Sequence, residues 1–259
     1  MAEKYSKYLK REARQRARHK LGPDLDFASA EAYKLFRTNV AFSFSEGEGG
    51  KVIGVTSSRP QDGKSFSSIN LAYSMAEKGY RVLLIDADMR RSSIAATLDK
   101  PLSPGLSNYL VGDAKDVIHK NVMHENLSLI TAGDLPPNPA ELIGSTRMKQ
   151  VLDALRQRYE YIIVDLPPVI LVSDAVVLSP CLDGVVLVTR HAYSKCSDIL
   201  ESVRQLKFVN ARIIGFVYND YGKRRRYRKQ NYNYYESKRK TDNYGSKKKR
   251  KADDSAASV

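Results

Sequence analysis

The stretch Val52–Phe66, with the sequence VIGVTSSRPQDGKSF, constrains the fold more than any other part of the chain. It begins as a short apolar run rich in β-branched residues, which is typical of a buried strand, and it ends on Gly63-Lys64-Ser65. A strand, a tight loop and a helix start form the arrangement that binds phosphate, because loop N–H groups and the helix N-terminus converge on the anion. The helix is indicated by apolar side chains at helical spacing, namely Ile69, Ala72, Tyr73, Ala76 and Tyr80.

The loop follows the pattern G-x-x-x-x-G-K-[ST] except at its first position, where Ser58 replaces the glycine. We expect Lys64 to reach the terminal phosphates of a nucleotide and the Ser65 hydroxyl to help hold Mg²⁺. The alternative is that this stretch is a solvated turn before a helix. The strand directly before it and the helix directly after it favour a phosphate-binding loop. The expected nucleotide contacts of the loop are Arg59, Pro60, Gln61, Asp62, Gly63, Lys64, Ser65 and Phe66.

The net charge of +14 belongs to the two ends of the chain. Residues 1–21 carry eight Lys/Arg against two acids, and residues 222–259 carry fourteen against four. We therefore divide the chain into a basic N-terminal arm at 1–26, a globular domain at 27–221 and a tail at 222–259. The tail holds almost no aliphatic side chains, so we expect it to be disordered.

Neither a membrane span nor a signal peptide is expected. No apolar run approaches the roughly 20 residues that cross a bilayer, and the charged N-terminus lacks the apolar stretch of a signal peptide. Two cysteines fit a reducing compartment. We expect a cytoplasmic protein whose role at a membrane, if it has one, comes through a partner or a charged surface.

Apolar runs alternate with helical patterns along the middle of the chain, which predicts a doubly wound, mostly parallel sheet flanked by helices, of the P-loop NTPase type. Ligands of such sheets bind at the carboxyl ends of the strands. After the first strand, at Val52, the further expected strands are Val82–Ile85, Leu127–Thr131, Tyr161–Val164, Gly184–Thr189 and Arg212–Val217. The expected helices lie at 27–44, 64–79, 139–158, 173–179 and 195–209.

Two of these strands run directly into aspartate. Val82–Ile85 is followed by Asp86 and Asp88, and Tyr161–Val164 by Asp165. An acid in this position lies at the carboxyl edge of the sheet, beside the phosphate loop. Asp165 and Asp88, with Ser65, are the expected Mg²⁺ ligands, because Mg²⁺ prefers hard oxygen donors. Asp86 is the expected base for a hydroxyl nucleophile. Each aspartate alone could equally be a helix cap or turn residue.

The segments SSRPQDGKS, VLLIDADMR and YIIVDLPPV, in this order and spacing, resemble the Walker A, A′ and B motifs of bacterial tyrosine kinases. GDLPPNPAELIGS at Gly133–Ser145 resembles a further stretch of that family. The resemblance covers residues 27–220 and the tyrosine-rich tail. It implies an ATP- and Mg²⁺-dependent kinase in which Lys64, Asp86, Asp88 and Asp165 are catalytic.

The resemblance also implies a setting. Relatives of this size regulate capsular or exopolysaccharide synthesis and export, and a membrane-anchored activator or chain-length regulator recruits them to the inner face of the cell membrane. A cognate tyrosine phosphatase and a homo-oligomeric ring are further implied partners. Two positions depart from the family loop P-G-E-G-K-[ST]-T: Gln61 replaces its glycine, and Phe66 its last threonine. Because a Cβ at Gln61 restricts the backbone, nucleotide binding is expected to be weakened.

Glu31, Lys34 and Arg37 resemble the family's E-x-x-R-x-x-R interface motif, with Lys34 at the first arginine. Lys lacks the bidentate fork of Arg, so the ring would be looser. The alternative is an ordinary surface helix with an i,i+3 ion pair. Asn219 lies where related P-loop proteins contact the base of the nucleotide, although a loop residue without such a contact is nearly as good an interpretation.

Six of the sixteen tyrosines follow the last strand. A segment without a core gains little from tyrosine, so the enrichment favours either stacking on nucleic acid bases or a role as phosphate acceptors, and the resemblance favours the second. The lysine run at 247–251 could contact an anionic membrane through charge alone. The expected autophosphorylation sites are Tyr221, Tyr227, Tyr232, Tyr234, Tyr235 and Tyr244.

The sequence therefore predicts a protein-tyrosine kinase that phosphorylates its own tail. One alternative is a partitioning or positioning ATPase of the ParA/MinD type, which usually carries a second lysine early in the phosphate loop, where this chain has only Arg59. The other is a non-catalytic polybasic binding protein. Nucleic acid is not the partner that we expect.

Overall fold

The computed structural model describes residues 21–44 and 49–220. The expectations for the N-terminal arm before Leu21, and for the tail with its six tyrosines, concern residues outside this part of the chain.

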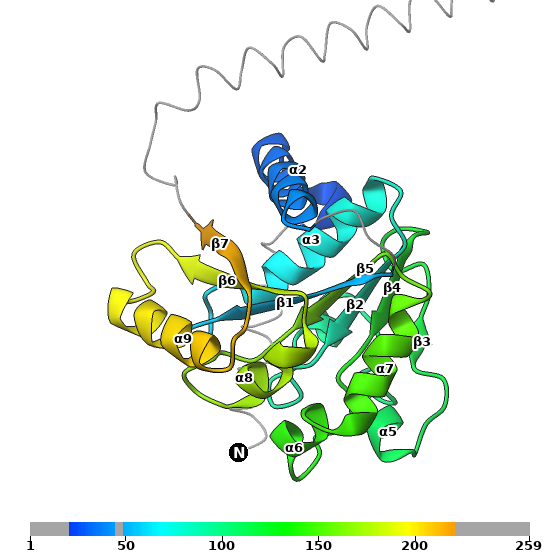
Figure 1. The fold of residues 1–259 in the computed structure, drawn as a ribbon. Coiled ribbons are helices and arrows are strands. Elements are labelled where there is room, and N and C mark those ends of the chain that lie inside the picture. The colour runs from blue at the N-terminus through cyan, green and yellow to red at the C-terminus, as the bar shows by residue number, and fades with distance from the viewer. Residues whose placement is uncertain (1–20, 45–48, 221–259) are drawn as a thin grey trace, which may run out of the picture. The chain divides into compact units, whose positions relative to one another are not determined.

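A seven-stranded sheet lies at the centre of the described residues, in the order β3-β4-β2-β5-β1-β6-β7 (Figure 1). All neighbouring strands are parallel except β3, which is antiparallel to β4. The predicted class, a mostly parallel doubly wound sheet, is confirmed. The strands are β1 (Lys51–Ser57), β2 (Val82–Asp86), β3 (Ile118–His119), β4 (Leu127–Ile130), β5 (Tyr161–Asp165), β6 (Gly184–Arg190) and β7 (Ile213–Asn219).

Helices cover both faces of the sheet (Figure 1). On one face α3 packs against the central strands and α2 packs on α3, while α7, α8 and α9 lie on the other face. The described helices are η1 (Gly22–Asp24), α2 (Phe27–Phe42), α3 (Lys64–Glu77), α4 (Ile94–Thr97), α5 (Leu106–Val111), α6 (Pro139–Ile143), α7 (Thr146–Arg156), α8 (Asp174–Leu178), η2 (Ser179–Cys181) and α9 (Cys196–Phe208). None of them is long and apolar enough to cross a lipid bilayer.

The sheet is buried on both sides, which explains why its strands read as continuous apolar runs. Along β2 the side chains alternate between two cores, with Leu83 and Ile85 on the face of α7 and Val82 and Leu84 on the face of α3. All four are fully buried. Because burying one such side chain contributes about 1.5–3 kcal/mol, the central strands are where the apolar sequence stabilises the fold most.

The expected helix at 139–158 is in fact two helices. Pro139 begins α6, and the chain breaks at Gly144 before Ser145 caps α7 by accepting a hydrogen bond from the Met148 N–H at 3.2 Å. The elements β3, α4 and α5 were not predicted. Each is too short to show a clear hydrophobic period, so its sequence carries little signal.

Strand order and register bring the predicted site together. β5 lies between β2 and β1, and the register pairs Asp86 with Asp165 and Val55 with Asp165. The phosphate loop leaves β1 one strand away. Asp165 is therefore central, with the loop on one side and Asp86 on the other.

Truncating a side chain in a central strand should cost far more stability than truncating one in a surface loop. We expect Leu84→Ala to lower the free energy of unfolding by about 2–5 kcal/mol, because it leaves a cavity in the core under α3. Urea unfolding followed by circular dichroism measures this value. The matched control is Leu102→Ala, whose side chain is 45% exposed and which should cost less than about 1 kcal/mol. Equal losses in the two variants would contradict this account of the core.

Candidate functional site

The phosphate loop joins β1 to α3 through two residues with left-handed backbone. Gln61 has φ 68° and Gly63 has φ 96°. The conformation at Gln61 is the one that a glycine would adopt without cost, so the substitution noted in the sequence does place a Cβ under strain. Gly63 has a second constraint, because an added Cβ would lie 2.0 Å from Nδ2 of Asn219.

Lys64, the first residue of α3, lies among carboxylates. Its Nζ is 2.8 Å from Asp88 Oδ2 and 3.2 Å from Asp165 Oδ2. Burial alone would lower the pKa of Lys64, but the charges of Asp165 and Asp88 outweigh it and hold this pKa above its ordinary value. The ammonium group is therefore charged at any physiological pH.

Asp165 is held by the first turn of the same helix. Its Oδ2 accepts a hydrogen bond from Ser65 Oγ at 2.6 Å, and its Oδ1 accepts one from Ser68 Oγ at 2.9 Å. Burial raises the pKa of Asp165, while Lys64 and Ser65 oppose that shift. Ser68 was not predicted, although it lies one helical turn beyond Lys64 and so faces the same way.

Asp86 is fully buried at the end of β2. Its Oδ2 accepts a hydrogen bond from Ser92 Oγ at 2.7 Å, and its Oδ1 accepts one from the Asp88 N–H at 3.2 Å. Burial, and then the charge of Asp165, raises the pKa of Asp86 to about 7. A carboxyl group with such a pKa can take up or release a proton near neutral pH, as a general base must. Ser92 was also not predicted, because no spacing rule connects it to Asp86.

The donor set fits a magnesium ion together with phosphate. Three carboxylates and one ammonium group leave a surplus of two negative charges when all are ionised, which matches one divalent cation. Ser65, Asp88 and Asp165 offer the oxygen donors that Mg²⁺ prefers, and Mg²⁺ usually takes its other ligands from phosphate and water. The described residues contain no group of three His, Cys, Asp or Glu side chains that could hold a metal ion by itself.

Three other predicted nucleotide contacts have partners within the protein. Asn219, at the end of β7, donates a hydrogen bond from Nδ2 to the Asp62 carbonyl at 3.0 Å, which brings it to the loop. Arg59 forms an ion pair with Asp198 of α9. Phe66 packs edge-on to Tyr33 of α2, with 6.3 Å between ring centroids. A base contact by Asn219 stays a prediction.

The predicted interface residues Glu31, Lys34 and Arg37 lie on α2 and do not take part in the cluster around Lys64. Lys34 Nζ lies 2.8 Å from Glu31 Oε1, which is the i,i+3 pair of the alternative interpretation. Arg37 donates hydrogen bonds to the carbonyl and hydroxyl oxygens of Ser74 at 2.6 and 3.3 Å, and so it joins α2 to α3. Their role between subunits stays a prediction.

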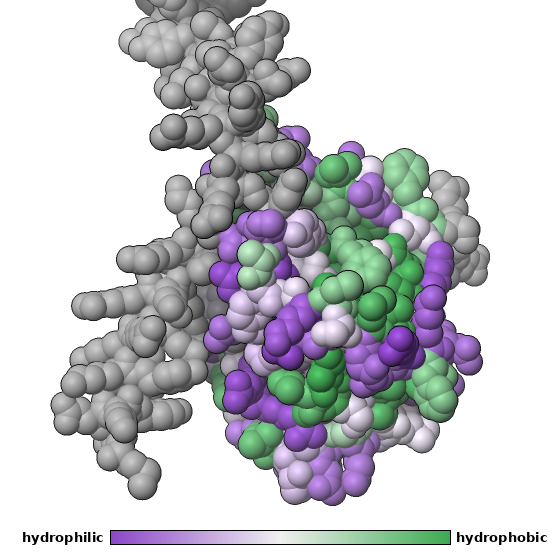
Figure 2. Space-filling model, turned by 90° about the vertical axis from the view of Figure 1, so that its left-hand side faces the viewer, coloured by the Kyte–Doolittle hydropathy of each residue, from purple (hydrophilic) through white to green (hydrophobic). Residues whose placement is uncertain are grey.

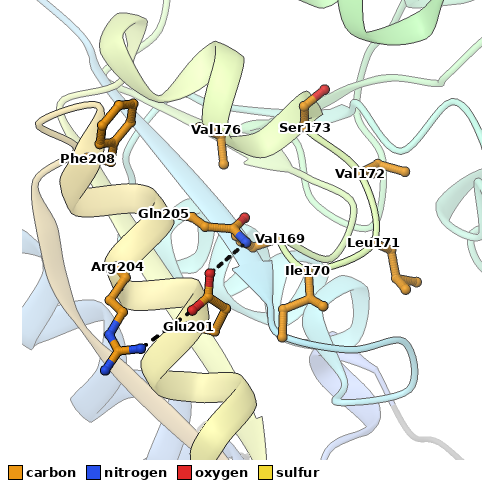
Figure 3. Close-up of a pocket in the computed structure, with 10 residues that line it drawn as sticks. All are labelled: Val169, Ile170, Leu171, Val172, Ser173, Val176, Glu201, Arg204, Gln205 and Phe208. Atoms are coloured by element: carbon orange, nitrogen blue, oxygen red, sulfur yellow. Dashed lines mark hydrogen bonds and ion pairs between the residues drawn. The ribbon is translucent and has the colours of Figure 1, made fainter.

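A surface cavity of about 530 Å³ lies elsewhere, between the chain that follows β5 and one side of α9 (Figure 3). Its walls are mostly apolar, and its polar side chains satisfy one another: Glu201 Oε1 accepts from Gln205 at 3.2 Å, and Glu201 Oε2 lies 3.7 Å from Arg204. None of the predicted nucleotide or metal residues lines it. It is lined by Val169, Ile170, Leu171, Val172, Ser173, Val176, Glu201, Arg204, Gln205 and Phe208.

Known proteins are similar to this chain in both sequence and fold. Residues 50–213 match the AAA domain family. The tyrosine-protein kinase CpsD of Streptococcus agalactiae is 34% identical over 215 residues, covering 77% of this chain and 92% of that protein. EpsB of Ralstonia nicotianae is 36% identical over 196 residues, which is 75% of this chain and only 26% of EpsB. The chain thus spans about a quarter of the length of EpsB.

The solved structures agree with this relationship. The kinase domain of the Escherichia coli tyrosine kinase ETK superposes with a TM-score of 0.72 at 33% identity, over 76% of this chain and 77% of that one. The septum site-determining protein MinD of Pyrococcus horikoshii, complexed with Mg-ADP, is more distant, with a TM-score of 0.57 at 26% identity over 67% of this chain and 71% of that one.

The raised pKa of Asp86 predicts a pH-dependent stability difference. The ordinary value is 3.8 and the folded value is about 7, so in this window the folded state binds the extra proton and the free energy of unfolding falls as pH rises. Asp86→Asn cannot ionise. We expect its melting temperature to match that of wild type at about pH 3.5, below the ordinary pKa, and to exceed it increasingly as the pH rises to about 8, measured without nucleotide or Mg²⁺. Asp153→Asn, on the exposed side of α7, should match wild type at both, and a pH-independent effect of Asp86→Asn would contradict the assignment.

Gly63 should tolerate no side chain. We expect Gly63→Ala to weaken nucleotide binding by at least about tenfold, because the new Cβ displaces Asn219 and opens the loop. The control is Gly79→Ala, which has a similar φ of 104° but open space around the added Cβ. Titration with a fluorescent ATP analogue measures both. If the two variants bind alike, the contact with Asn219 is not what excludes a side chain.

Proposed function

Because the chain belongs to the family of bacterial tyrosine-protein kinases built on an AAA-type domain, we propose that it is an ATP-dependent protein-tyrosine kinase. The observation that carries the proposal is the meeting of Lys64 with Asp88 and Asp165 beside a phosphate loop, one strand from a buried Asp86. CpsD and CapB, which are named tyrosine-protein kinases among the relatives, support the same reaction for this chain.

Each residue has a distinct part in the proposed reaction. Bound ATP and Mg²⁺ would supply the phosphoryl group and neutralise its charge. Lys64 would bind oxygens of the terminal phosphates, and Ser65, Asp88 and Asp165 would hold the metal shell. Asp86 would accept the proton of the tyrosine hydroxyl as its oxygen bonds to the γ-phosphorus, while the bond from that phosphorus to the bridging oxygen breaks and ADP leaves. The loop and Asn219 orient the nucleotide.

The acceptor that we propose is the chain's own tail. Six tyrosines, Tyr221 and five within residues 222–259, stand among basic residues, and a polybasic segment is attracted to an acidic site. Since a phosphotyrosine carries about −1.5 to −2 at neutral pH, six of them would nearly cancel the net +10 of residues 222–259. Phosphorylation would thereby release the tail and loosen a ring built through Glu31, Lys34 and Arg37.

We further propose the cellular setting of the relatives for this chain. It would act in the cytoplasm at the inner face of the cell membrane, recruited by a membrane-anchored activator or chain-length regulator. There it would regulate capsular or exopolysaccharide synthesis and export, and a cognate tyrosine phosphatase would remove the phosphate groups. The names CpsD and CapB, and a solved chimera named CapA2B2, support a kinase that works with a partner protein. The greater distance to MinD argues against a positioning ATPase. A polybasic binder without catalysis does not explain the buried acids.

Labelled ATP distinguishes these functions. With its activator present, the protein should acquire label on tail tyrosines. Lys64→Met should lower the labelling rate at least about 100-fold, because the phosphates lose their cation. A variant with all six tyrosines from Tyr221 to Tyr244 changed to Phe should acquire no label there. Phosphopeptide mapping measures the sites. Lys78→Met, at the exposed other end of α3, is the control. Hydrolysis of ATP without any phosphotyrosine would favour the positioning ATPase instead.

A further inference from the structure

The phosphate loop is held from one side by a single segment of the chain. This segment, Arg190–Ser202, runs from the last residue of β6 into α9, and we refer to it as the loop clasp. It makes contacts with five consecutive residues of the loop, Ser58 to Asp62. Most of these contacts use side chains of the clasp, so they depend on its sequence and not only on the fold.

The central contact joins Ser194 to Asp62. Ser194 Oγ donates to Asp62 Oδ1 at 2.7 Å and accepts from the Arg190 N–H at 2.6 Å. Asp62 has no exposed surface, and its other oxygen accepts from the Arg59 N–H at 3.2 Å. A buried carboxylate needs such donors, so removing the Ser194 hydroxyl leaves it short of one.

Further contacts flank this centre. Arg59 pairs with Asp198, and Tyr193 donates from its hydroxyl group to the Pro60 carbonyl at 3.2 Å. The hydroxyl oxygens of Ser58 and Ser202 lie 3.0 Å apart, both fully buried. Ser58 is the residue that replaces the first glycine of the loop pattern. Its side chain therefore has a matching partner on α9.

The clasp also contacts the strained residue of the loop. Arg190 donates from Nη1 to the Gln61 carbonyl at 3.3 Å, where φ is 68°. A left-handed residue with a Cβ keeps that conformation only when its surroundings fix it. The clasp supplies these contacts on both sides of Gln61, through Pro60 and Asp62. None of them occupies the side chains of Lys64 or Ser65.

We propose that the loop clasp is the positioning element for the nucleotide, with Ser194 and Asp198 as its main positioning residues. It holds a phosphate loop that departs from the family pattern at Ser58 and Gln61 in the shape that receives phosphate. The proposal rests on the proposed binding of ATP by this loop. It differs from a purely structural role in one respect: loss of the clasp weakens nucleotide binding and leaves the chemical step intact once the site is saturated.

The first test is Ser194→Ala. We expect the dissociation constant of a fluorescent ATP analogue and the KM for ATP to rise about tenfold, because a buried carboxylate loses a donor and the loop is no longer fixed. The kcat at saturating ATP should change by less than about twofold. Ser194→Thr keeps the hydroxyl and should restore binding. Ser43→Ala, which removes a half-buried hydroxyl that donates to the Asn39 carbonyl of α2 at 2.8 Å, should bind as wild type does.

The second test needs no change at the centre of the clasp, and decides the matter if Ser194→Ala does not fold. Asp198→Asn removes the charge that faces Arg59 and should also raise the dissociation constant and KM, whereas Asp153→Asn, another helical aspartate near an arginine at 3.9 Å, should not. A lower kcat with unchanged KM, or unchanged binding in the clasp variants, would overturn the proposal. Wild type that binds no ATP analogue would instead overturn the proposed function itself.

Discussion

The burial of three carboxylates around one ammonium group is the interaction on which the site depends. A buried carboxylate is costly unless a cation or hydrogen-bond donors compensate for the water that it loses. Lys64 compensates Asp88 and Asp165 directly, and Ser65 and Ser68 add hydroxyl donors to Asp165. Asp86 forms no direct ion pair with the described residues, and its pKa is raised to about 7, so that protonation offsets the cost of burial. One cluster thus contains both a permanent cation and a group that titrates near neutrality.

The parallel sheet is what makes this cluster possible. Parallel strands end at a common edge, and a register that pairs Asp86 with Asp165 brings two acids onto neighbouring strands at the same height. An antiparallel arrangement of these two strands would place the acids at opposite edges. The apolar residues of β2 and β5, buried on both faces, hold that register and so hold the acids together despite their mutual repulsion.

Much of this arrangement could be predicted from the sequence, because its signals are local. Continuous apolar runs identified six strands to within two residues, and the G-K-S turn between a strand and a helix identified the loop. The missed parts depend on distant contacts. Nothing near Asp62 in the sequence indicates Ser194, since this pair meets only after folding. Ser92 lies six residues from Asp86, but no spacing rule connects the two. The break before Ser145 is the reverse case. Here a local signal, the N-cap at Ser145 that begins α7, divides a stretch that was predicted as one helix.

The order of the strands within the sheet was the other part that could not be predicted. Periodicity identifies a strand but not its neighbours, and the central place of β5 follows from packing across the whole sheet. The strand β3 lies at one edge of the sheet, and it, α4 and α5 are only two to six residues long, so their sequence pattern is correspondingly weak.

The helix α9 belongs to two surfaces at once. Asp198 and Ser202 contact the phosphate loop, while Glu201 and Gln205 line the apolar cavity beside the chain that follows β5 (Figure 3). Figure 2 shows the side of the molecule on which α9 lies, where apolar and polar residues are interspersed over the surface. One helix of 13 residues thus provides walls for the cavity and contacts for the phosphate loop. A ligand in the cavity would touch the same element that holds the loop, although no residue of the loop lines the cavity.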